Sequence, residues 1–368
     1  MVLHEFTALR VPLCLACVLL SLLPACLTGA CLTGTCLVWA RRVWAMQEAP
    51  FGDREFSPQE SENGPRLDPP KVQYLEVGVV ITAEAGTCRD ILCTVPVPLD
   101  CPEQQVRVVN EDVSPLVSEL KYRSIGPTGR ESETGTARQM VLRIPQLPAG
   151  EECRAVVTFE VRRSTMQPPQ ETSQYEVCDA RKLPKEVRPY LKGSPKIEVQ
   201  DPKIKALARR LREEHAEEPA WERVKAIYDW VRANVAYSEG PLRGAAAALE
   251  AKQGDCEELT SLFIALCRAN GIPARSVWVP GHCYPEFYLV DGQGQGYWFP
   301  CQAAGTEAFG GIPEERPILQ KGDSFRTPEK PRETQRYVAE FLTGTPVPGA
   351  GSPKVKFIRQ IVPRPAGA

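Results

Sequence analysis

The stretch that decides the fold of this chain runs from residue 254 to residue 275 and reads GDCEELTSLFIALCRANGIPAR. Leu259, Leu262, Phe263 and Leu266 recur at the spacing of one buried helix face. The helix should stop at Asn270-Gly271, because asparagine and glycine end helices and Pro273 cannot continue one. The pattern therefore predicts a buried helix that begins at Cys256.

Cys256 is predicted to be a reactive thiol because of its place at the start of this helix. A thiolate is the nucleophilic form of cysteine, and the free N–H groups and dipole of a helix N-terminus stabilise that anion. Gly254 allows close backbone approach just before it. Cys267 lies further along the same helix beside its apolar row, and we expect it only to pack in the core.

The chain has three histidines, and the base for such a nucleophile must be one of them. His4 belongs to the apolar N-terminal segment, and His215 lies in a run of charged residues that is typical of a solvated helix face. His282 opens a predicted strand after a turn at Pro280-Gly281. A single strand histidine is often structural, but His282 is the available partner for Cys256.

A third side chain should orient the imidazole. The predicted strand 282–290 turns through residues 291–295 into a strand at 297–302, a Gly-containing hairpin that places Gln302 nearly opposite His282. The Gln302 amide oxygen could then accept the Nδ1–H of His282 and leave Nε2 facing the thiol, much as an asparagine does in papain-like proteases. The candidate catalytic residues are therefore Cys256, His282 and Gln302.

Three motifs in order resemble those of transglutaminase-like proteins. They are the 254–275 helix, the histidine strand HCYPEFYL at 282–289 with a glutamate four residues after the histidine, and the strand WFPCQ at 298–302. The resemblance implies an α+β fold with a papain-like transglutaminase core, in which helices pack on an antiparallel sheet. It also implies that Cys256 attacks an amide carbonyl to form a thioester, which water or an amine resolves by hydrolysis or transamidation.

The chain departs from the family pattern in two places. The family usually has aspartate where this chain has Gln302, and a neutral amide stabilises an imidazolium less than a carboxylate does. The segment between Cys256 and His282 is short, which predicts an open cleft. The backbone N–H of Cys256 would be one oxyanion donor, and Gln253 and Tyr237 are weaker candidates for a second.

Other functions fit parts of the same pattern. Cys256, His282, Cys283 and Cys301 could hold zinc, but no C-x-x-C pair follows the N-terminal segment, so we expect neither metal nor cofactor. Cys283 and Cys301 could instead form a disulfide or pack behind the site. The main alternative to an enzyme is a catalytically weakened or inactive binding or scaffold protein of the cell envelope.

Composition narrows the possible partners. The 368 residues carry 44 Lys and Arg against 46 Asp and Glu, so the net charge of −2 offers no basic footprint for nucleic acid. The expected partner is a protein or peptide substrate. Five of 14 cysteines lie in the first 40 residues, and the pairing of the others cannot be read from the sequence.

The chain divides into five predicted segments. Residues 1–45 form a signal peptide or membrane anchor, since residues 11–40 are uncharged and apolar, and we expect a periplasmic, extracellular or membrane-anchored protein. Residues 46–70 form a flexible linker, and period-two apolar runs in 71–165 predict an all-β, sandwich-like domain. Residues 180–305 form the catalytic domain. Residues 306–368 form an extended tail with one weak helix at about 333–342.

Overall fold

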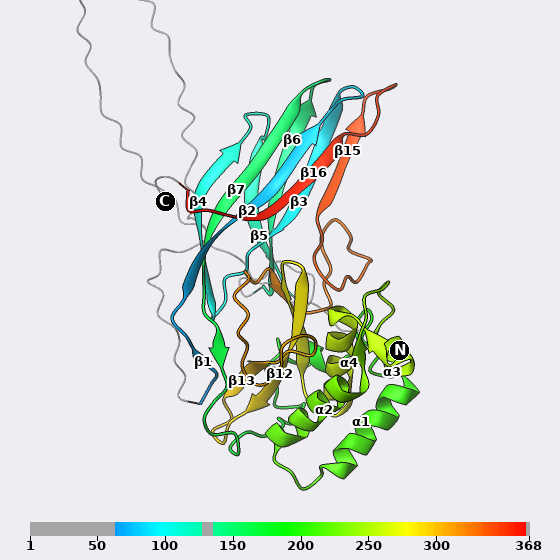
Figure 1. The fold of residues 1–368 in the computed structure, drawn as a ribbon. Coiled ribbons are helices and arrows are strands. Elements are labelled where there is room, and N and C mark those ends of the chain that lie inside the picture. Colours follow the sequence, from blue (N-terminus) through cyan, green and yellow to red (C-terminus); the bar gives the residue numbers. More distant parts are fainter. Residues whose placement is uncertain (1–62, 127–134, 366–368) are drawn as a thin grey trace, which may run out of the picture. The chain divides into compact units, whose positions relative to one another are not determined.

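The computed structural model describes residues 63–126 and 135–365, so the predicted segment 1–45 and most of the predicted linker lie outside it. The fold is mixed α+β, with a helical layer on a short antiparallel sheet and a β-rich region beside it (Figure 1). Within the described residues, no helix has the length and apolar character that a membrane span needs.

The four α-helices come from one continuous part of the chain. They are α1 (Pro202–Glu214), α2 (Ala220–Asn234), α3 (Ala245–Ala251) and α4 (Cys256–Ala269), with a 3-10 helix, η1 (Arg188–Leu191), before them. The Asp201 side chain caps α1 by accepting from the backbone N–H groups of Lys203 and Ile204. The helix predicted to begin at Cys256 is confirmed as α4, whereas the short alanine-rich helix α3 was not predicted.

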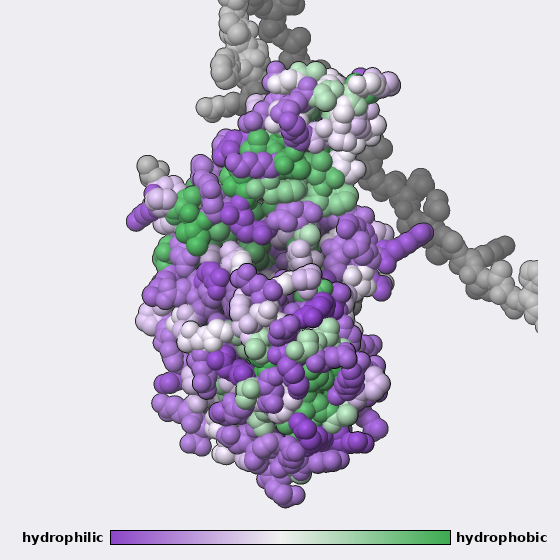
Figure 2. Space-filling view, turned by 45° about the vertical axis from the view of Figure 1, so that its right-hand side comes forward, coloured by the Kyte–Doolittle hydropathy of each residue, from purple (hydrophilic) through white to green (hydrophobic). Residues whose placement is uncertain are grey.

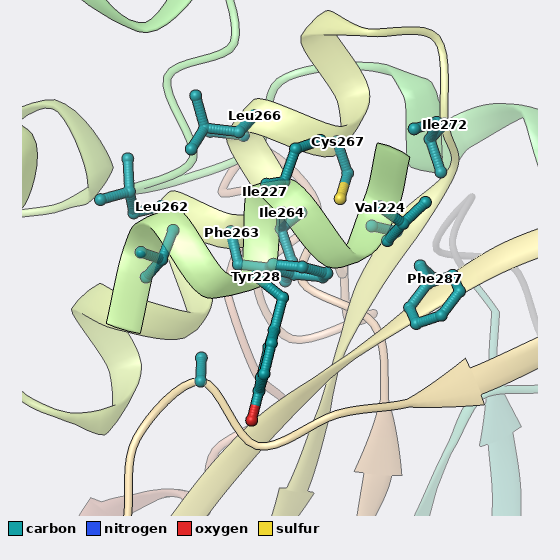
Figure 3. Packing of buried hydrophobic residues seen from close by; sticks show 14 of the residues in the cluster. Val224, Ile227, Tyr228, Leu262, Phe263, Ile264, Leu266, Cys267, Ile272 and Phe287 are labelled. Carbon is teal, nitrogen blue, oxygen red and sulfur yellow. The ribbon is translucent and has the colours of Figure 1, made fainter. Parts of the chain in front are cut away.

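Helix α4 is the most buried element of this layer. Its apolar side chains share one core cluster with those of α2 and with Phe287 of the sheet (Figure 3). Cys267 is fully buried in this cluster, which confirms that it packs in the core. At the C-terminal end of the helix, the Ile272 N–H donates to the Cys267 carbonyl and Gly271 adopts a positive φ of 76°, as the predicted stop signal requires.

The sheet beneath α4 is built from two successive hairpins. Its strands are β11 (Ala274–Val279), β12 (His282–Val290) and β13 (Gly296–Pro300). Strand β12 lies in the middle and pairs antiparallel with β11 on one side and β13 on the other. The predicted hairpin about residues 291–295 is confirmed, but the predicted pairing of residues 282 and 302 is wrong. The β12–β13 ladder stops at the Glu286–Pro300 pair, before it reaches His282.

The β-rich region has two sheets around its own apolar core. Its main strands are β2 (Lys71–Thr82), β3 (Cys88–Val97), β4 (Gln104–Val113), β5 (Glu119–Ile125), β6 (Ala137–Leu147) and β7 (Glu152–Arg163). The β-rich region predicted from period-two apolar runs in residues 71–165 is confirmed, and the runs correspond to β2, β3, β6 and β7. The edge strands β4 and β5 were not predicted, because charged and polar side chains interrupt their apolar alternation. Hydrophobic side chains are prominent on the face of this region that Figure 2 shows.

The last 60 residues return to the β-rich region. Strands β14 (Gln320–Lys321), β15 (Phe341–Pro346) and β16 (Lys354–Val362) pair with β11 and β6, with β3, and with β2, respectively. Through β14, the sheet of the helical layer continues into a sheet of the β-rich region. The helix predicted at 333–342 is wrong, since turns and extended chain lead into β15 there.

Two pairs of very short strands complete the described part of the chain. Strand β1 (Arg66–Leu67) pairs with β8 (Met166–Gln167), and β9 (Ala236–Tyr237) pairs in parallel with β10 (Gln253–Gly254). The β9–β10 pair lies just before α4, so it fixes the backbone that enters the helix at Cys256.

Candidate active site

A capping box formed by Asp255 and Glu258 holds the start of α4, where Cys256 is the first helical residue. The Asp255 side chain accepts from the N–H groups of Glu257 and Glu258, while the Glu258 carboxylate accepts from the Asp255 N–H at 3.3 Å. A Cβ on Gly254 would lie 2.7 Å from the Glu258 Cβ, so a side chain there would push Glu258 out of the box. The local sequence therefore fixes where the Cys256 thiol points.

His282 reaches this thiol from the first position of β12, directly after the two-residue turn that joins β11 to β12. Val279 pairs with His282 across the turn, and Gly281 has a φ of 71°, which favours glycine. His282 Nε2 lies 3.1 Å from Gln302 Oε1, and the imidazole also hydrogen bonds to Cys256. The predicted orientation of the ring is therefore wrong: Nε2 binds Gln302, and Nδ1 is the nitrogen left to face the sulfur.

Gln302 reaches His282 from beyond the end of β13. Its carbonyl accepts from Arg232 of α2 at 2.9 Å, and its N–H donates to the Ala308 carbonyl at 2.8 Å. Arg232 also binds the Gly305 carbonyl at 3.0 Å. The loop is thus fastened to α2, and Gln302 meets the imidazole although the strands no longer pair at that point.

The three side chains favour a charged thiolate–imidazolium pair. A hydrogen bond from Cys283 is the largest influence on Cys256, and with the His282 contact it outweighs burial and lowers the pKa of the thiol to about 4. Burial alone would lower the pKa of His282, but its bonds to Cys256 and Gln302 raise it above the usual value. Both shifts favour the ion pair at neutral pH.

Cys283 lies directly beneath the candidate nucleophile. Its side chain is 1% exposed, its Sγ lies 3.8 Å from the Cys256 carbonyl oxygen, and its thiol hydrogen bonds to the Cys256 thiol. One turn along α4, the Thr260 hydroxyl donates to the Cys283 carbonyl at 3.4 Å. These contacts fasten the first turn of α4 to β12, so the residue after the histidine also shapes the site.

Two hollows open on either side of Cys256, and both are lined by Cys256, Gly281 and His282. One, of about 200 Å³, is walled by Trp278 and by residues that include Tyr337 and Arg359. The other, of about 550 Å³, is walled by Tyr237 and by small or apolar residues that include Leu259 and Ala303.

The first hollow is lined in part by residues that the sequence did not identify as site residues. Tyr337, Glu340 and Arg359 line it, although they belong to the predicted extended tail. Arg359 forms an ion pair with Glu340, which joins β16 to the segment before β15. Neither periodicity nor a motif marked these residues, because the approach of the C-terminal segment to the cysteine depends on strand pairing between distant parts of the chain.

The two weak candidates for an oxyanion donor differ in position. Tyr237 lines the larger hollow with Cys256 although it is 58% exposed, and partial desolvation and then the nearby Cys256 charge raise the pKa of its phenol. Gln253 pairs with Ala236 in the β9–β10 ladder, and it lines neither hollow. Tyr237 is therefore the better placed of the two.

Glu286, four residues after His282, takes part in buried ion pairs that join parts of the fold. Glu286 is fully buried, 2.9 Å from Arg275 and 2.8 Å from Lys321. Lys321 also binds Glu103, a buried residue of the β-rich region. These buried charges are paired, as charges inside a protein must be, and they connect β12 through β14 to the β-rich region.

The described residues contain no cluster of three or more His, Cys, Asp or Glu side chains that is arranged to hold a metal ion. Cys283 and Cys301 do not form the disulfide that was considered, since all nine described cysteines are free thiols. Both cysteines are buried, and Cys301 packs in the core cluster of α4.

This geometry agrees with the comparison against protein-family models. Residues 205–303 match the model of the transglutaminase-like superfamily, and the match contains Cys256, His282 and Gln302. These residues belong to the transglutaminase-like superfamily. The match includes α2, α4 and the sheet β11–β13, and it ends just after Gln302. No curated protein matches the chain.

The comparison with solved structures found three chains that are similar to this one. A candidate cysteine protease from Cytophaga hutchinsonii is 18% identical, with a TM-score of 0.47, over 82% of this chain and 94% of that one. The periplasmic domain of TgpA from Pseudomonas aeruginosa, bound to ethylmercury, is 15% identical, with a TM-score of 0.30, over 64% of this chain and 90% of that one. A candidate protease from Parabacteroides distasonis is 13% identical, with a TM-score of 0.23, over 60% of this chain and 47% of that one.

Proposed function

We propose that the protein is a cysteine enzyme that acts on amide bonds of proteins or peptides, with Cys256 as nucleophile, His282 as acid and base, and Gln302 as the residue that orients the imidazole. The observation that carries the proposal is the contact of the helix-capped Cys256 thiol with an imidazole whose far nitrogen is held by Gln302. Membership of the transglutaminase-like superfamily supports the same chemistry.

In the proposed first step, the Cys256 thiolate attacks the carbonyl carbon of an amide. The negative charge moves to the carbonyl oxygen, where the backbone N–H of Cys256 and the phenol of Tyr237 could stabilise it. His282 then gives the proton on Nδ1 to the amide nitrogen, the C–N bond breaks, and the amine leaves. The acyl group remains on Cys256 as a thioester.

The second step resolves this thioester. Neutral His282 takes a proton from water or from an amine, which attacks the thioester carbonyl and releases the Cys256 thiolate. Water gives hydrolysis, and an amine gives transamidation. Gln302 keeps the Nε2–H of the ring directed away from the sulfur, so Nδ1 can take and give the proton in both steps.

The same proposal places the enzyme outside the cytoplasm or at a membrane. The support is the uncharged run of residues 11–40, which has the character of a signal-peptide core or a membrane anchor. A protein or peptide in the cell envelope or the extracellular space is then the expected substrate.

The decisive experiment traps the thioester. The full chain is mixed with a peptide library and quenched in acid, and the protein mass is measured with and without a primary amine. We expect acylated Cys256, which disappears faster when the amine is an acceptor. Cys256→Ser should form no thioester, and Cys178→Ser, which removes a thiol far along the chain, should behave as wild type.

The alternative is a binding or scaffold protein with a weakened site, because Gln302 carries no charge to stabilise the imidazolium. A chain that binds peptides from the library but forms no acylated Cys256, with no turnover above the Cys256→Ser variant, would contradict the enzyme proposal. The released product then separates the two reactions: a carboxylic acid indicates hydrolysis, and a new amide indicates transamidation.

A further inference from the structure

The pair formed by Cys256 and Cys283 has a chemistry that amide cleavage does not use. The two thiols are hydrogen bonded to each other, and Cys283 Sγ also lies 3.8 Å from the Cys256 carbonyl oxygen. We propose that peroxide converts this pair into a reversible disulfide, so that oxidation turns the site off without destroying its nucleophile.

The two thiols differ in access. Cys256 lines both hollows, so a small oxidant in either of them reaches its sulfur. Cys283 is 1% exposed and lies behind Cys256. The hydrogen bond to Cys256 and then burial raise the pKa of Cys283, so it stays protonated while Cys256 carries the charge. Oxidant therefore attacks Cys256 first, and Cys283 is the nearby thiol that can resolve the product.

The reaction balances with hydrogen peroxide as the oxidant. The Cys256 thiolate attacks one oxygen of the peroxide, the O–O bond breaks, and the products are a sulfenic acid and hydroxide, which takes a proton to become water. The Cys283 sulfur then attacks the Cys256 sulfur. Its proton leaves with the hydroxyl group as a second water, and a Cys256–Cys283 bond forms.

A contact beside the pair holds together the two elements that carry the thiols. The Thr260 hydroxyl binds the Cys283 carbonyl at 3.4 Å, so the first turn of α4 is already fastened to β12 beside both sulfurs. A disulfide is about 2.05 Å long, much shorter than a thiol–thiol hydrogen bond. Its formation should draw the Cys256 sulfur inward, away from His282 and from both hollows, which removes the nucleophile from the site.

Other cysteines are poorer partners for Cys256. Cys267 and Cys301 are fully buried in the core cluster of α4, and Cys93 and Cys153 lie in the core of the β-rich region. Among the described cysteines, Cys283 is the one whose thiol bonds to Cys256. The partner in the disulfide is therefore specified by the fold.

The test treats the full chain with hydrogen peroxide, blocks remaining thiols with N-ethylmaleimide and maps peptides by mass spectrometry without reduction. We expect a linked Cys256–Cys283 peptide and complete loss of Cys256 labelling, which dithiothreitol restores. The readout is a covalent bond, so it stands whether or not the chain cleaves amides, and failure of one proposal is distinguishable from failure of the other.

The informative variant is Cys283→Ser, which keeps a hydrogen-bond donor but removes the resolving sulfur. In this variant peroxide should take Cys256 to sulfinic or sulfonic acid, and dithiothreitol should not restore its labelling. Cys178→Ser removes a different thiol and should still give the linked peptide. If Cys283→Ser does not fold, Cys283→Ala serves the same purpose.

The proposal is overturned if wild type yields no linked peptide and loses Cys256 to sulfinic acid as fast as the Cys283 variant does. It is also overturned if Cys256 is found linked to another cysteine. Recovery of the linked peptide in wild type and its loss in the Cys283 variant alone would establish the pair.

Discussion

The charge on Cys256 predicts how its alkylation depends on pH. The fold lowers the pKa of this thiol to about 4, so the thiolate is present above that pH and is lost as the pH falls through it. An ordinary thiol with a pKa of about 8.5 is only about 0.03% thiolate at pH 5 and about 3% at pH 7. Cys256 should be almost fully charged at both.

The magnitude must include the weaker nucleophilicity of a less basic thiolate. With a Brønsted coefficient of about 0.4–0.5, a pKa lower by about 4.5 units makes each thiolate roughly 60- to 180-fold less reactive. Cys256 should therefore react about 15- to 50-fold faster than an ordinary thiol at pH 5, yet no faster at pH 7. The diagnostic quantity is the pH profile, and a single rate at neutral pH is not informative.

The assay is peptide-resolved labelling of the folded chain with iodoacetamide at a series of pH values. We expect the Cys256 rate to rise by only about a tenth between pH 5 and pH 7, whereas an ordinary thiol should rise about 100-fold. Cys178, which is partly exposed and whose pKa is raised by burial, is an internal reference in the same sample. Cys267 should stay unlabelled because it is fully buried.

Two variants test the cause of the low pKa. His282→Ala and Cys283→Ala each remove one of the two thiol contacts, and each should move the midpoint of the Cys256 profile to higher pH, with the larger shift for Cys283. The reasoning is refuted if wild-type Cys256 loses reactivity from pH 7 to pH 5 in step with Cys178, or if neither variant moves the midpoint.

Three further outcomes are expected. Gln302→Glu places a carboxylate beside His282 and should raise its pKa, which moves the alkaline limb of the activity profile to higher pH; an unchanged limb would show that residue 302 does not act on the ring. Lys321→Met removes the cation between the buried carboxylates of Glu103 and Glu286, of which Glu286 keeps Arg275 as a partner, and should cost about 3–5 kcal/mol in urea unfolding. A cost below about 1 kcal/mol would show that this network is not stabilising. Burial alone would raise the pKa of Glu103, but Lys321 and Arg163 together outweigh burial and lower that pKa to about 2. Wild-type stability should therefore fall as the pH drops from about 4 toward 2.

Local signals in the sequence predicted most of the helical layer. The start of α4 at Cys256, its end at Asn270-Gly271 and the hairpin at residues 291–295 depend on caps and turn residues that lie within a few positions. The contact between His282 and Gln302 was also predicted. The strand pairing of residues 282 and 302 that was used to predict this contact was wrong. The loop that carries Gln302 is held instead by Arg232 of α2.

What the sequence could not predict depends on distant parts of the chain. Which nitrogen of His282 faces Cys256 depends on the exact approach of Gln302. The approach of Tyr337 and Arg359 to the hollow beside Cys256 depends on strands that pair across more than half of the chain, such as β16 with β2. The role of Cys283 depends on how closely α4 packs on β12, which no short-range pattern records.

The two-residue strand β14 makes the segment that matches the superfamily dependent on its surroundings. Lys321, on this strand, neutralises Glu286 of β12 and Glu103 of the β-rich region, and β14 pairs with β11 on one side and β6 on the other. A gene fragment cut to residues 205–303 would therefore encode a protein in which Glu286 keeps Arg275 but loses Lys321, and in which the β11 edge of the sheet is left unpaired. Grafting this segment into another protein would require the β-rich region to be transferred with it.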